Sequence, residues 1–131
     1  MEKSYLEANT YGVGQLITQR KLLRVPEHQR DFAWEKEDVE SFFRDITSAL
    51  KRDDPDYFIG LIVLLGPHEG TWQILDGQQR LATTIMIYSA IRNWLASRNY
   101  DADSNQIETE YIGVRHLGGK YNSRLTMNES N

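Results

Sequence analysis

The sequence predicts a single α/β domain of the α+β type, in which a mixed sheet is flanked by helices. Apolar residues recur at helical spacing over residues 36–50 and 81–98, which indicates two amphipathic helices. Between them, residues 57–65 and 71–75 form apolar runs separated by a loop that contains Gly and Pro, as in paired strands. A chain of 131 residues that is 40% hydrophobic is also long enough to bury one core.

The first part of the chain predicts a short helix, a strand and a long helix. The short helix covers residues 13–19, and the strand over residues 22–25 ends at Pro26, which cannot donate to a β-ladder. A polar loop with two aromatic residues follows. The long helix, over residues 36–50, is expected to bury one apolar face, made of Val39, Phe42, Phe43, Ile46, Ala49 and Leu50.

The middle of the chain predicts a hairpin and a second long helix. The run at residues 57–65 is nearly continuous in apolar residues, which is typical of a strand covered on both faces. Residues 71–75 predict the returning strand of the hairpin. The helix is expected to run from about Leu81 to about Arg98.

The end of the sequence predicts little regular structure. Residues 101–110 are polar and are expected to form a loop, while 111–114 and 124–127 are candidates for short strands. Asn128 is a candidate helix cap. A capping pattern at this position favours the hypothesis that the 131 residues are the N-terminal part of a longer protein.

Composition and charge exclude several classes of protein. The sequence has no cysteine, which rules out disulfides and thiolate metal sites. No apolar run approaches the length of a membrane span, and residues 1–4 lack the pattern of a signal peptide, so we expect a soluble, cytoplasmic domain without a membrane partner. The net charge of −4 disfavours tight, sequence-independent DNA binding by this segment alone, although a local basic patch is compatible with it.

A block of five residues stands where the second strand of the hairpin gives way to the helix, and it contains Asp76, Gly77, Gln78, Gln79 and Arg80. Helix N-termini attract anions, so this 76–80 loop is a candidate site for a polyphosphate. Gly77 and neighbouring N–H groups would cradle phosphates, and Arg80 would neutralise their charge. Asp76 would hold Mg²⁺ or orient a water molecule.

A purely structural interpretation of the 76–80 loop is also open. Gly77 can serve a tight turn, and Asp76 can be the N-cap of the helix, with Gln79 completing a capping box. In that case the Asp76 carboxylate occupies the place where a phosphate would sit. A P-loop and a G-x-G-x-x-G fingerprint are both absent from the sequence.

A second Gln-Arg pair, Gln29 and Arg30, follows the first strand. If the strands before the two pairs lie in one sheet and end on the same side, Arg30 and Arg80 can converge on one polyphosphate. Arginine suits this role because its planar fork binds phosphate oxygens bidentately. No Ser-His-Asp arrangement is visible, and metal-ligand spacing is absent from the three histidines, His28, His68 and His116.

Three blocks of the sequence resemble a known family. They are Val25-Pro26-Glu27-His28-Gln29-Arg30-Asp31-Phe32-Ala33-Trp34, Tyr57-Phe58-Ile59-Gly60 and Asp76-Gly77-Gln78-Gln79-Arg80-Leu81. In this order they are similar to the N-terminal domain of GmrSD-type, modification-dependent restriction enzymes and related phage-defence proteins, a domain that is similar to the ParB and sulfiredoxin fold. The chain departs from the family pattern at His28, where Tyr is common, and at Ala82, where Thr is frequent.

The resemblance implies a domain that binds a nucleoside triphosphate and hydrolyses it with Mg²⁺. It implies that the 76–80 loop binds the nucleotide together with Gln29 and Arg30. In the family this activity regulates a nuclease domain that cuts modified foreign DNA, and no nuclease motif occurs in these 131 residues. Residues 1–100 are therefore expected to form the nucleotide-binding core, and residues 101–131 a loop and the start of further structure.

Two other functions remain compatible with the sequence. One is a non-catalytic module that senses DNA modification, or a nucleotide-gated switch, which uses the same loop without turnover. The other is a structural interaction domain in which the 76–80 loop is only a capped turn. Release of phosphate over time distinguishes the enzyme from the switch, which binds without release. Failure of any nucleotide or DNA to protect the fold against heating favours the interaction domain.

Overall fold

The computed structural model of the protein describes residues 10–20, 22–26, 33–54, 57–115 and 117–126. Its first elements are helix α1 (Val13–Arg20), strand β1 (Leu22–Arg24) and helix α2 (Lys36–Lys51). All three lie where the sequence predicts them. A capping box explains where α2 starts, because the Glu35 and Asp38 side chains and backbone N–H groups satisfy one another reciprocally.

A hairpin and a long helix follow, made of β2 (Val63–His68), β3 (Thr71–Asp76) and α3 (Gln78–Ser97). Strand β3 and helix α3 confirm the predictions. The strand predicted for residues 57–65 is present only in its last part, because β2 begins at Val63, after Gly60 with φ +137°, and continues to His68. Among the described residues, no helix has both the length and the apolar character needed to cross a membrane.

The last part of the described chain is more regular than predicted. Residues 101–110, expected to form a loop, contain helix α4 (Asp101–Ile107) and the first part of a π-helical turn, η1 (Glu108–Ile112). Three short strands follow, namely β4 (Gly113–Arg115), β5 (Tyr121–Ser123) and β6 (Leu125–Thr126). Strands β4 and β6 overlap predicted strands, whereas β5 was not expected. The candidate cap Asn128 lies outside the described residues.

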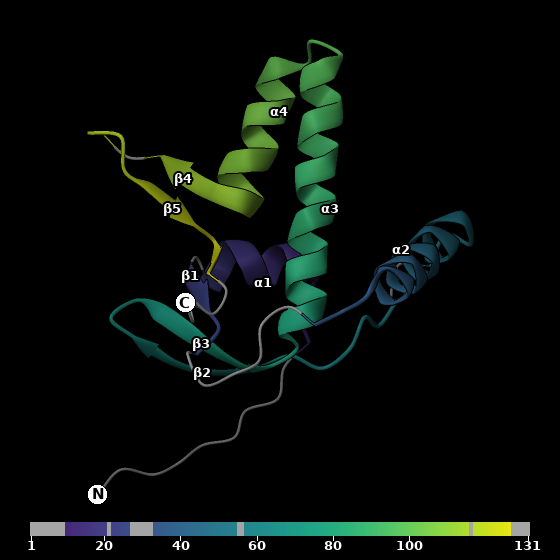
Figure 1. The fold of residues 1–131 in the computed structure, drawn as a ribbon, viewed down its shortest axis with the longest axis horizontal. Coiled ribbons are helices and arrows are strands. Elements are labelled where there is room, and N and C mark those ends of the chain that lie inside the picture. Colours follow the sequence, from purple (N-terminus) through teal and green to yellow (C-terminus); the bar gives the residue numbers. More distant parts are fainter. Residues whose placement is uncertain (1–9, 21, 27–32, 55–56, 116, 127–131) are drawn as a thin grey trace, which may run out of the picture.

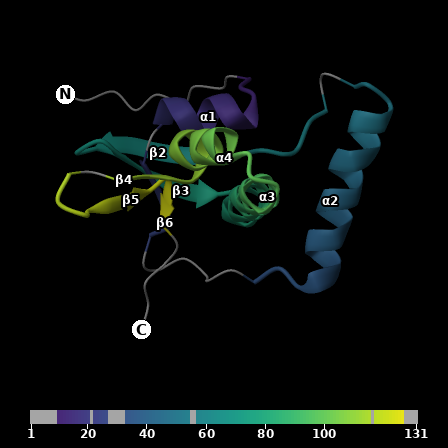
Figure 2. The same cartoon turned by 90° about the horizontal axis from the view of Figure 1, so that it is seen from above.

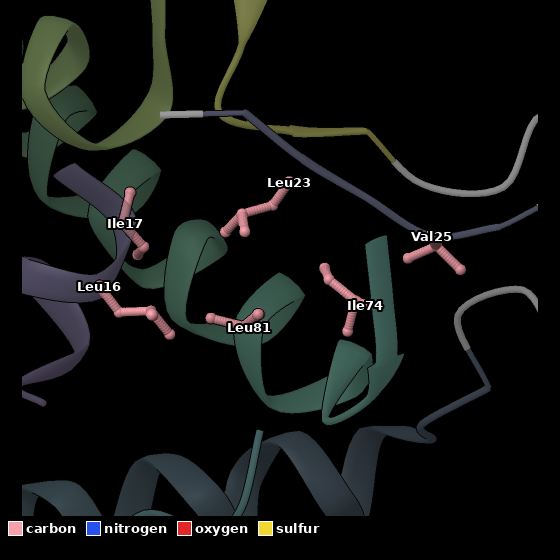
Figure 3. Packing of buried hydrophobic residues seen from close by; sticks show 6 residues of the cluster. All are labelled: Leu16, Ile17, Leu23, Val25, Ile74 and Leu81. Atoms are coloured by element: carbon pink, nitrogen blue, oxygen red, sulfur yellow. The ribbon is translucent and has the colours of Figure 1, made fainter. Parts of the chain in front are cut away.

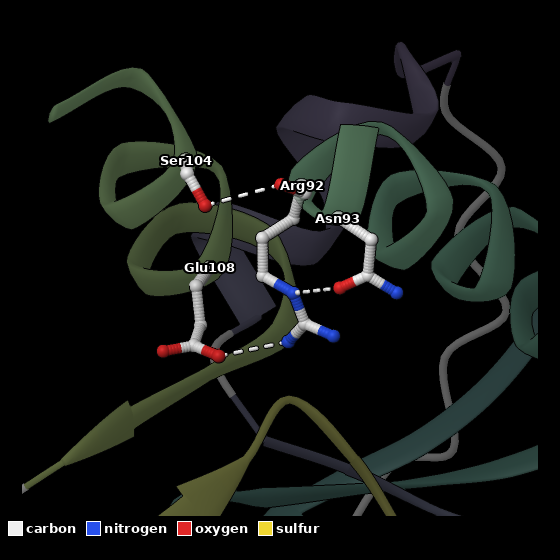
Figure 4. Close-up of polar contacts among 4 residues, drawn as sticks. All are labelled: Arg92, Asn93, Ser104 and Glu108. Carbon is white, nitrogen blue, oxygen red and sulfur yellow. Dashed lines mark hydrogen bonds and ion pairs between the residues drawn. The ribbon is translucent and has the colours of Figure 1, made fainter. Parts of the chain in front are cut away.

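Polar contacts between α3 and the α4–η1 segment explain why residues 101–110 are helical (Figure 4). The Ser104 hydroxyl donates to the Arg92 carbonyl at 3.1 Å, and the Arg92 guanidinium pairs with the Glu108 carboxylate at 2.8 Å. Ser104 is buried, so its hydroxyl needs this partner. These contacts join residues that are far apart in the sequence, so the local pattern of residues 101–110 does not reveal them.

The main sheet is mixed and has the strand order β2-β3-β1-β6. Strand β3 runs antiparallel to β2 and parallel to β1, and β1 also runs parallel to β6. Helices α1, α3 and α4 lie on one side of this sheet (Figure 1). The architecture confirms the predicted α+β class, with β2 as an edge strand whose Leu65 is 56% exposed.

The core lies between the sheet and the helices (Figure 3). Alternate residues of the two central strands point into it, because side chains of a strand alternate between its two faces. The buried cluster consists of Leu16, Ile17, Leu23, Val25, Ile74 and Leu81. Above it, the rings of Tyr88 and Tyr111 stack with their centroids 4.2 Å apart. Burial, and next the neighbouring Tyr111, raise the pKa of Tyr88 above its usual value.

Helix α2 lies to one side of the rest of the described chain, beyond α3 (Figure 2). Of the six residues predicted to form its buried face, only Phe42 and Ala49 are buried. Phe43 is 51% exposed and Leu50 is 74% exposed. The prediction of a fully buried apolar face is therefore wrong, because α2 and α3 leave between them an apolar groove of about 520 Å³, lined by Val39, Phe43, Met86, Ile87, Ala90, Ile91 and Trp94, among others.

Candidate functional site

The two central strands of the sheet end at the same edge. Strand β1 pairs with β3 in parallel, with Leu23 beside Trp72 and Arg24 beside Gln73. Parallel pairing of these two strands is the condition for the two Gln-Arg pairs to converge, because each pair follows one of the strands. The chain after β1 is described as far as Pro26 and again from Ala33. Three residues predicted for this segment, Gln29, Arg30 and His28, lie outside the described residues.

Gly77 forms the turn between β3 and α3, and no other residue type fits there. Its φ of +94° is a left-handed conformation that side chains with a Cβ rarely adopt. A Cβ at this position would meet Ile62 Cδ1 at 2.5 Å and the Leu61 carbonyl oxygen at 3.0 Å. The backbone of the 76–80 loop is therefore in direct contact with the segment that precedes β2.

Asp76 does not cap helix α3. The N-cap is Gly77, which has no side chain with which to make a capping hydrogen bond. Asp76 Oδ1 accepts a hydrogen bond from the Gly77 N–H at 3.0 Å. The first hydrogen bond of the helix runs from the Leu81 N–H to the Gly77 carbonyl, so the N–H groups of residues 78–80 precede the helical ladder.

Gln79 does not complete a capping box either, and here the structural interpretation of the loop is wrong. Its side-chain oxygen accepts hydrogen bonds from the backbone N–H groups of Ala33, at 3.0 Å, and Trp34, at 3.1 Å. These partners lie 46 and 45 positions away in the sequence. Gln79 thus ties the segment that leads into α2 to the start of α3, beside the edge where β1 and β3 end.

Arg80 lies against the backbone of Gly60. A Cβ on Gly60 would stand 2.6 Å from Arg80 Nε and 2.9 Å from Arg80 Cζ, so the glycine leaves the space that the guanidinium needs. The Arg80 side chain is half-buried, and no hydrogen-bond or ion-pair partner for its guanidinium is found within the described residues. A guanidinium held in place by packing, with its donors uncommitted in this part of the chain, is suited to bind an anion.

The remaining loop residue, Gln78, is buried. Four of the five predicted loop residues thus have a described role in local structure: Asp76 accepts from Gly77, Gly77 turns the chain, Gln79 holds the 33–34 backbone and Arg80 packs on Gly60. Sequence reasoning missed Gly60 as a partner of this loop. A glycine that interrupts an apolar run was a signal for close contact by another group.

The 76–80 loop contains one carboxylate that could bind a metal ion, that of Asp76. No group of three or more His, Asp or Glu side chains that could hold a metal is present among the described residues. Asp76 is exposed, and its Oδ1 accepts the Gly77 N–H, which leaves Oδ2 for a ligand. Magnesium is commonly held by one or two carboxylates together with phosphate oxygens and water, so this donor set fits Mg²⁺ with a polyphosphate and not a metal bound by protein alone.

Comparison with known families gives one match. Residues 13–130 match the family described as GmrSD restriction endonuclease, N-terminal domain. The matched range covers the whole described sheet, the 76–80 loop and the segment that contains Gln29 and Arg30. A comparison with curated protein sequences finds no match.

Proposed function

The chain belongs to the family of GmrSD restriction endonuclease N-terminal domains, and from this premise we propose that its 76–80 loop binds a nucleoside triphosphate and hydrolyses it. The family is one of restriction and phage-defence proteins. In this proposal the nucleotide regulates a nuclease domain, in cis or in trans, that acts on modified DNA. DNA is reached through the full-length protein.

The observation that carries the proposal is the start of α3 at the edge where β1 and β3 both end, with a glycine as its N-cap. The N–H groups of residues 78–80 precede the helical ladder, and the N-cap residue, Gly77, has no side chain that could cap them. Such N–H groups, together with the helix dipole, favour a phosphate. Asp76 leaves this position open because its carboxylate accepts from Gly77 and not from the first turn of the helix.

The charged side chains of the loop fit the same ligand. Arg80 lies two residues after the helix start and is oriented by its contact with Gly60. A fixed guanidinium stabilises charge that develops on phosphoryl oxygens without having to reorganise. Mg²⁺, when bound through Asp76 and phosphate oxygens, would supply further neutralisation of that charge. Arg30 would add a second guanidinium from the segment that follows β1.

A nucleotide-gated switch without turnover is the second candidate. It is favoured by the fact that the 76–80 loop contains a single carboxylate and no histidine, so Asp76 alone would have to orient the attacking water. A switch needs only tight binding of the nucleotide and a conformational change in the segments that the loop contacts. The backbone of Ala33 and Trp34, held by Gln79, is such a segment.

A thermal-shift panel tests the proposal. The chain is heated with each common nucleoside triphosphate and Mg²⁺, and a ligand that binds the folded state raises the melting temperature. We expect at least one triphosphate to stabilise the chain in the presence of Mg²⁺. Phosphate release over time then separates hydrolysis from switching. If no nucleotide shifts the melting temperature, the proposal is wrong and the loop serves only to hold the fold together.

A further inference from the structure

Helix α3 carries two apolar stripes, and one of them is largely exposed. The first stripe, with Leu81, Ile85 and Tyr88, packs in the core or against it. The second stripe lines the apolar groove between α2 and α3 and consists of Met86, Ile87, Ala90, Ile91 and Trp94. A helix that is apolar on both sides is usually buried on both sides. The second stripe therefore calls for a partner.

The exposed side chains around the groove are large. Met86, Ile91 and Trp94, together with Phe43 on the α2 side, are each between 42% and 54% exposed. A half-exposed side chain of this size offers roughly 100 Å² of surface. With Arg98, these side chains offer about 500 Å² per copy, or about 1,000 Å² for two copies that face each other. This area lies at the lower limit for a specific interface.

Trp94 and Arg98 form a stacked pair near the end of α3. The Arg98 guanidinium carbon lies 5.0 Å from the centre of the Trp94 ring, a distance at which the cation is attracted to the ring. Both residues are exposed, so the pair is presented to a partner. Tryptophan and arginine are among the residue types that most often anchor protein interfaces.

The α2 side of the groove carries the complementary charge. Glu40 is the one charged residue among those that line the groove. Its carboxylate contacts the Lys36 ammonium at 3.7 Å, but its side chain is 53% exposed, so it can accept a second cation. Helix α2 lies beside the first half of α3 (Figure 1), whereas Arg98 directly follows the end of α3. The acid and the base thus stand toward opposite ends of the groove.

We propose that this groove is the interface between two copies of the chain, related by a two-fold axis. The Trp94–Arg98 pair of each copy enters the groove of the other. There the indole packs against Met86 and Phe43, and the guanidinium pairs with Glu40. A two-fold interface requires one surface to carry both halves of every contact. The apolar anchor, the apolar groove, the base and the acid all lie on one face of the chain, which favours a second copy over an unrelated partner.

This inference goes beyond nucleotide binding and uses other residues than the 76–80 loop. An interface of about 1,000 Å² is typical of weak complexes, so we expect a dissociation constant on the order of 10–100 µM. At about 1 µM, where unfolding of the chain is measured, the chain is then a monomer. The two copies can associate whether or not the 76–80 loop binds a nucleotide.

Sedimentation velocity of the chain, over concentrations from about 1 to about 500 µM, tests the inference. The wild type should change from monomer to dimer across this range. Trp94→Ala removes the central anchor and should weaken association at least about tenfold. The matched control is Leu65→Ala, which removes a similarly exposed apolar side chain from β2 and should associate like wild type.

An exchange of charges tests the two-fold arrangement itself. Arg98→Glu sets acid against Glu40 at both contacts, and Glu40→Arg sets base against Arg98. Each variant alone should therefore associate at least about tenfold more weakly than wild type. In an equal mixture of the two variants, both contacts again join opposite charges, so the mixture should associate within about threefold of wild type. Both side chains are exposed, and the melting temperatures at low concentration should stay near that of the wild type.

Three results would overturn the inference. They are a wild type that remains monomeric at the highest concentration, equal association of Trp94→Ala and Leu65→Ala, and a mixture of the charge variants that associates no better than either alone. A monomeric wild type would assign the groove to a different partner. Binding of nucleoside triphosphate, measured by calorimetry on Trp94→Ala, should equal that of the wild type, so failure of the nucleotide proposal is seen separately.

Discussion

The 76–80 loop and helix α2 differ in how the rest of the molecule holds them. Every described contact of the loop is specific: Gly77 meets Ile62, Gln79 binds the 33–34 backbone and Arg80 lies on Gly60. Helix α2 is held less closely, because only Phe42 and Ala49 of its apolar residues are buried. A short loop is thus fixed on several sides, while a helix of 16 residues is held at a few points.

The comparison shows which parts of the domain are held in one fixed arrangement. A binding site needs groups held close to one arrangement, which packing and hydrogen bonds from neighbouring segments provide. An element with few buried contacts opens locally at a lower free energy than the core does. The two regions are connected, because Gln79 holds the Trp34 backbone and the Trp34 ring meets the Phe42 ring edge-on, with centroids 5.6 Å apart.

The largest effect is expected for Gly77→Ala. The new Cβ meets Ile62 at 2.5 Å and the backbone must keep a positive φ, so the free energy of unfolding should fall by about 2–4 kcal/mol. Urea unfolding measures this. Gly70→Ala is the matched control, since Gly70 also has a positive φ but its Cβ would enter open space, and about 1 kcal/mol is expected there. Equal losses in the two variants would show that the loop does not pack against Ile62.

A smaller effect is expected for Phe42→Ala. Phe42 is the large buried side chain of α2 and the contact of Trp34, so its removal should lower the free energy of unfolding by about 2–3 kcal/mol. The amide protons of residues 36–51 should lose their protection from hydrogen exchange before those of the rest of the fold do. A loss below about 1 kcal/mol would mean that Phe42 does not anchor the helix.

Gln79→Ala should have a more local effect. It removes two neutral hydrogen bonds to the Ala33 and Trp34 N–H groups, which together contribute about 1–2 kcal/mol. The exchange rates of these two amide protons should rise well above those of the core strands. Gln79→Glu keeps a side-chain acceptor oxygen and should preserve much of their protection. Unchanged exchange in Gln79→Ala would contradict the link between α3 and the segment that leads into α2.

The smallest effect is expected for Phe43→Ser and Leu50→Ser on the exposed part of α2. These side chains are already largely in contact with water, so each substitution should change the free energy of unfolding by no more than about 0.5 kcal/mol. The same urea titration measures this. A loss comparable to that of Phe42→Ala would show that the groove between α2 and α3 is closed in solution.

Much of the fold could be predicted from local pattern. The periodicity of residues 13–19, 36–50 and 81–98 identified α1, α2 and α3, and the turn-forming residues between the apolar runs identified the hairpin. The errors have long-range causes. Helix α4 depends on Ser104 and Glu108 reaching Arg92, and residues 57–62 leave the extended strand because Gly60 makes room for Arg80.

The position of the 76–80 loop in the fold was predictable, and its contacts were less so. The change from strand pattern to helix pattern placed residues 76–80 correctly, and the parallel pairing of β1 with β3 fulfils the condition set for the two Gln-Arg pairs. The capping interpretation of Asp76 and Gln79 is wrong, because the Gln79 side-chain oxygen accepts a hydrogen bond from the backbone of Ala33, 46 residues earlier in the chain. A spacing of three residues cannot distinguish a capping box from a tertiary contact. Nucleotide binding, Mg²⁺ and the roles of Gln29 and Arg30 remain predictions.

Calorimetric titration of the preferred nucleoside triphosphate with Mg²⁺ into wild type, Arg80→Ala and Arg44→Ala is the most direct test of the nucleotide site. A hydrogen bond to a charged group contributes about 1.5–3 kcal/mol, so Arg80→Ala should bind at least about tenfold more weakly while its melting temperature without ligand stays near that of the wild type. Arg44→Ala, which removes an arginine from α2, should bind like wild type. Equal affinities for wild type and Arg80→Ala would contradict the account.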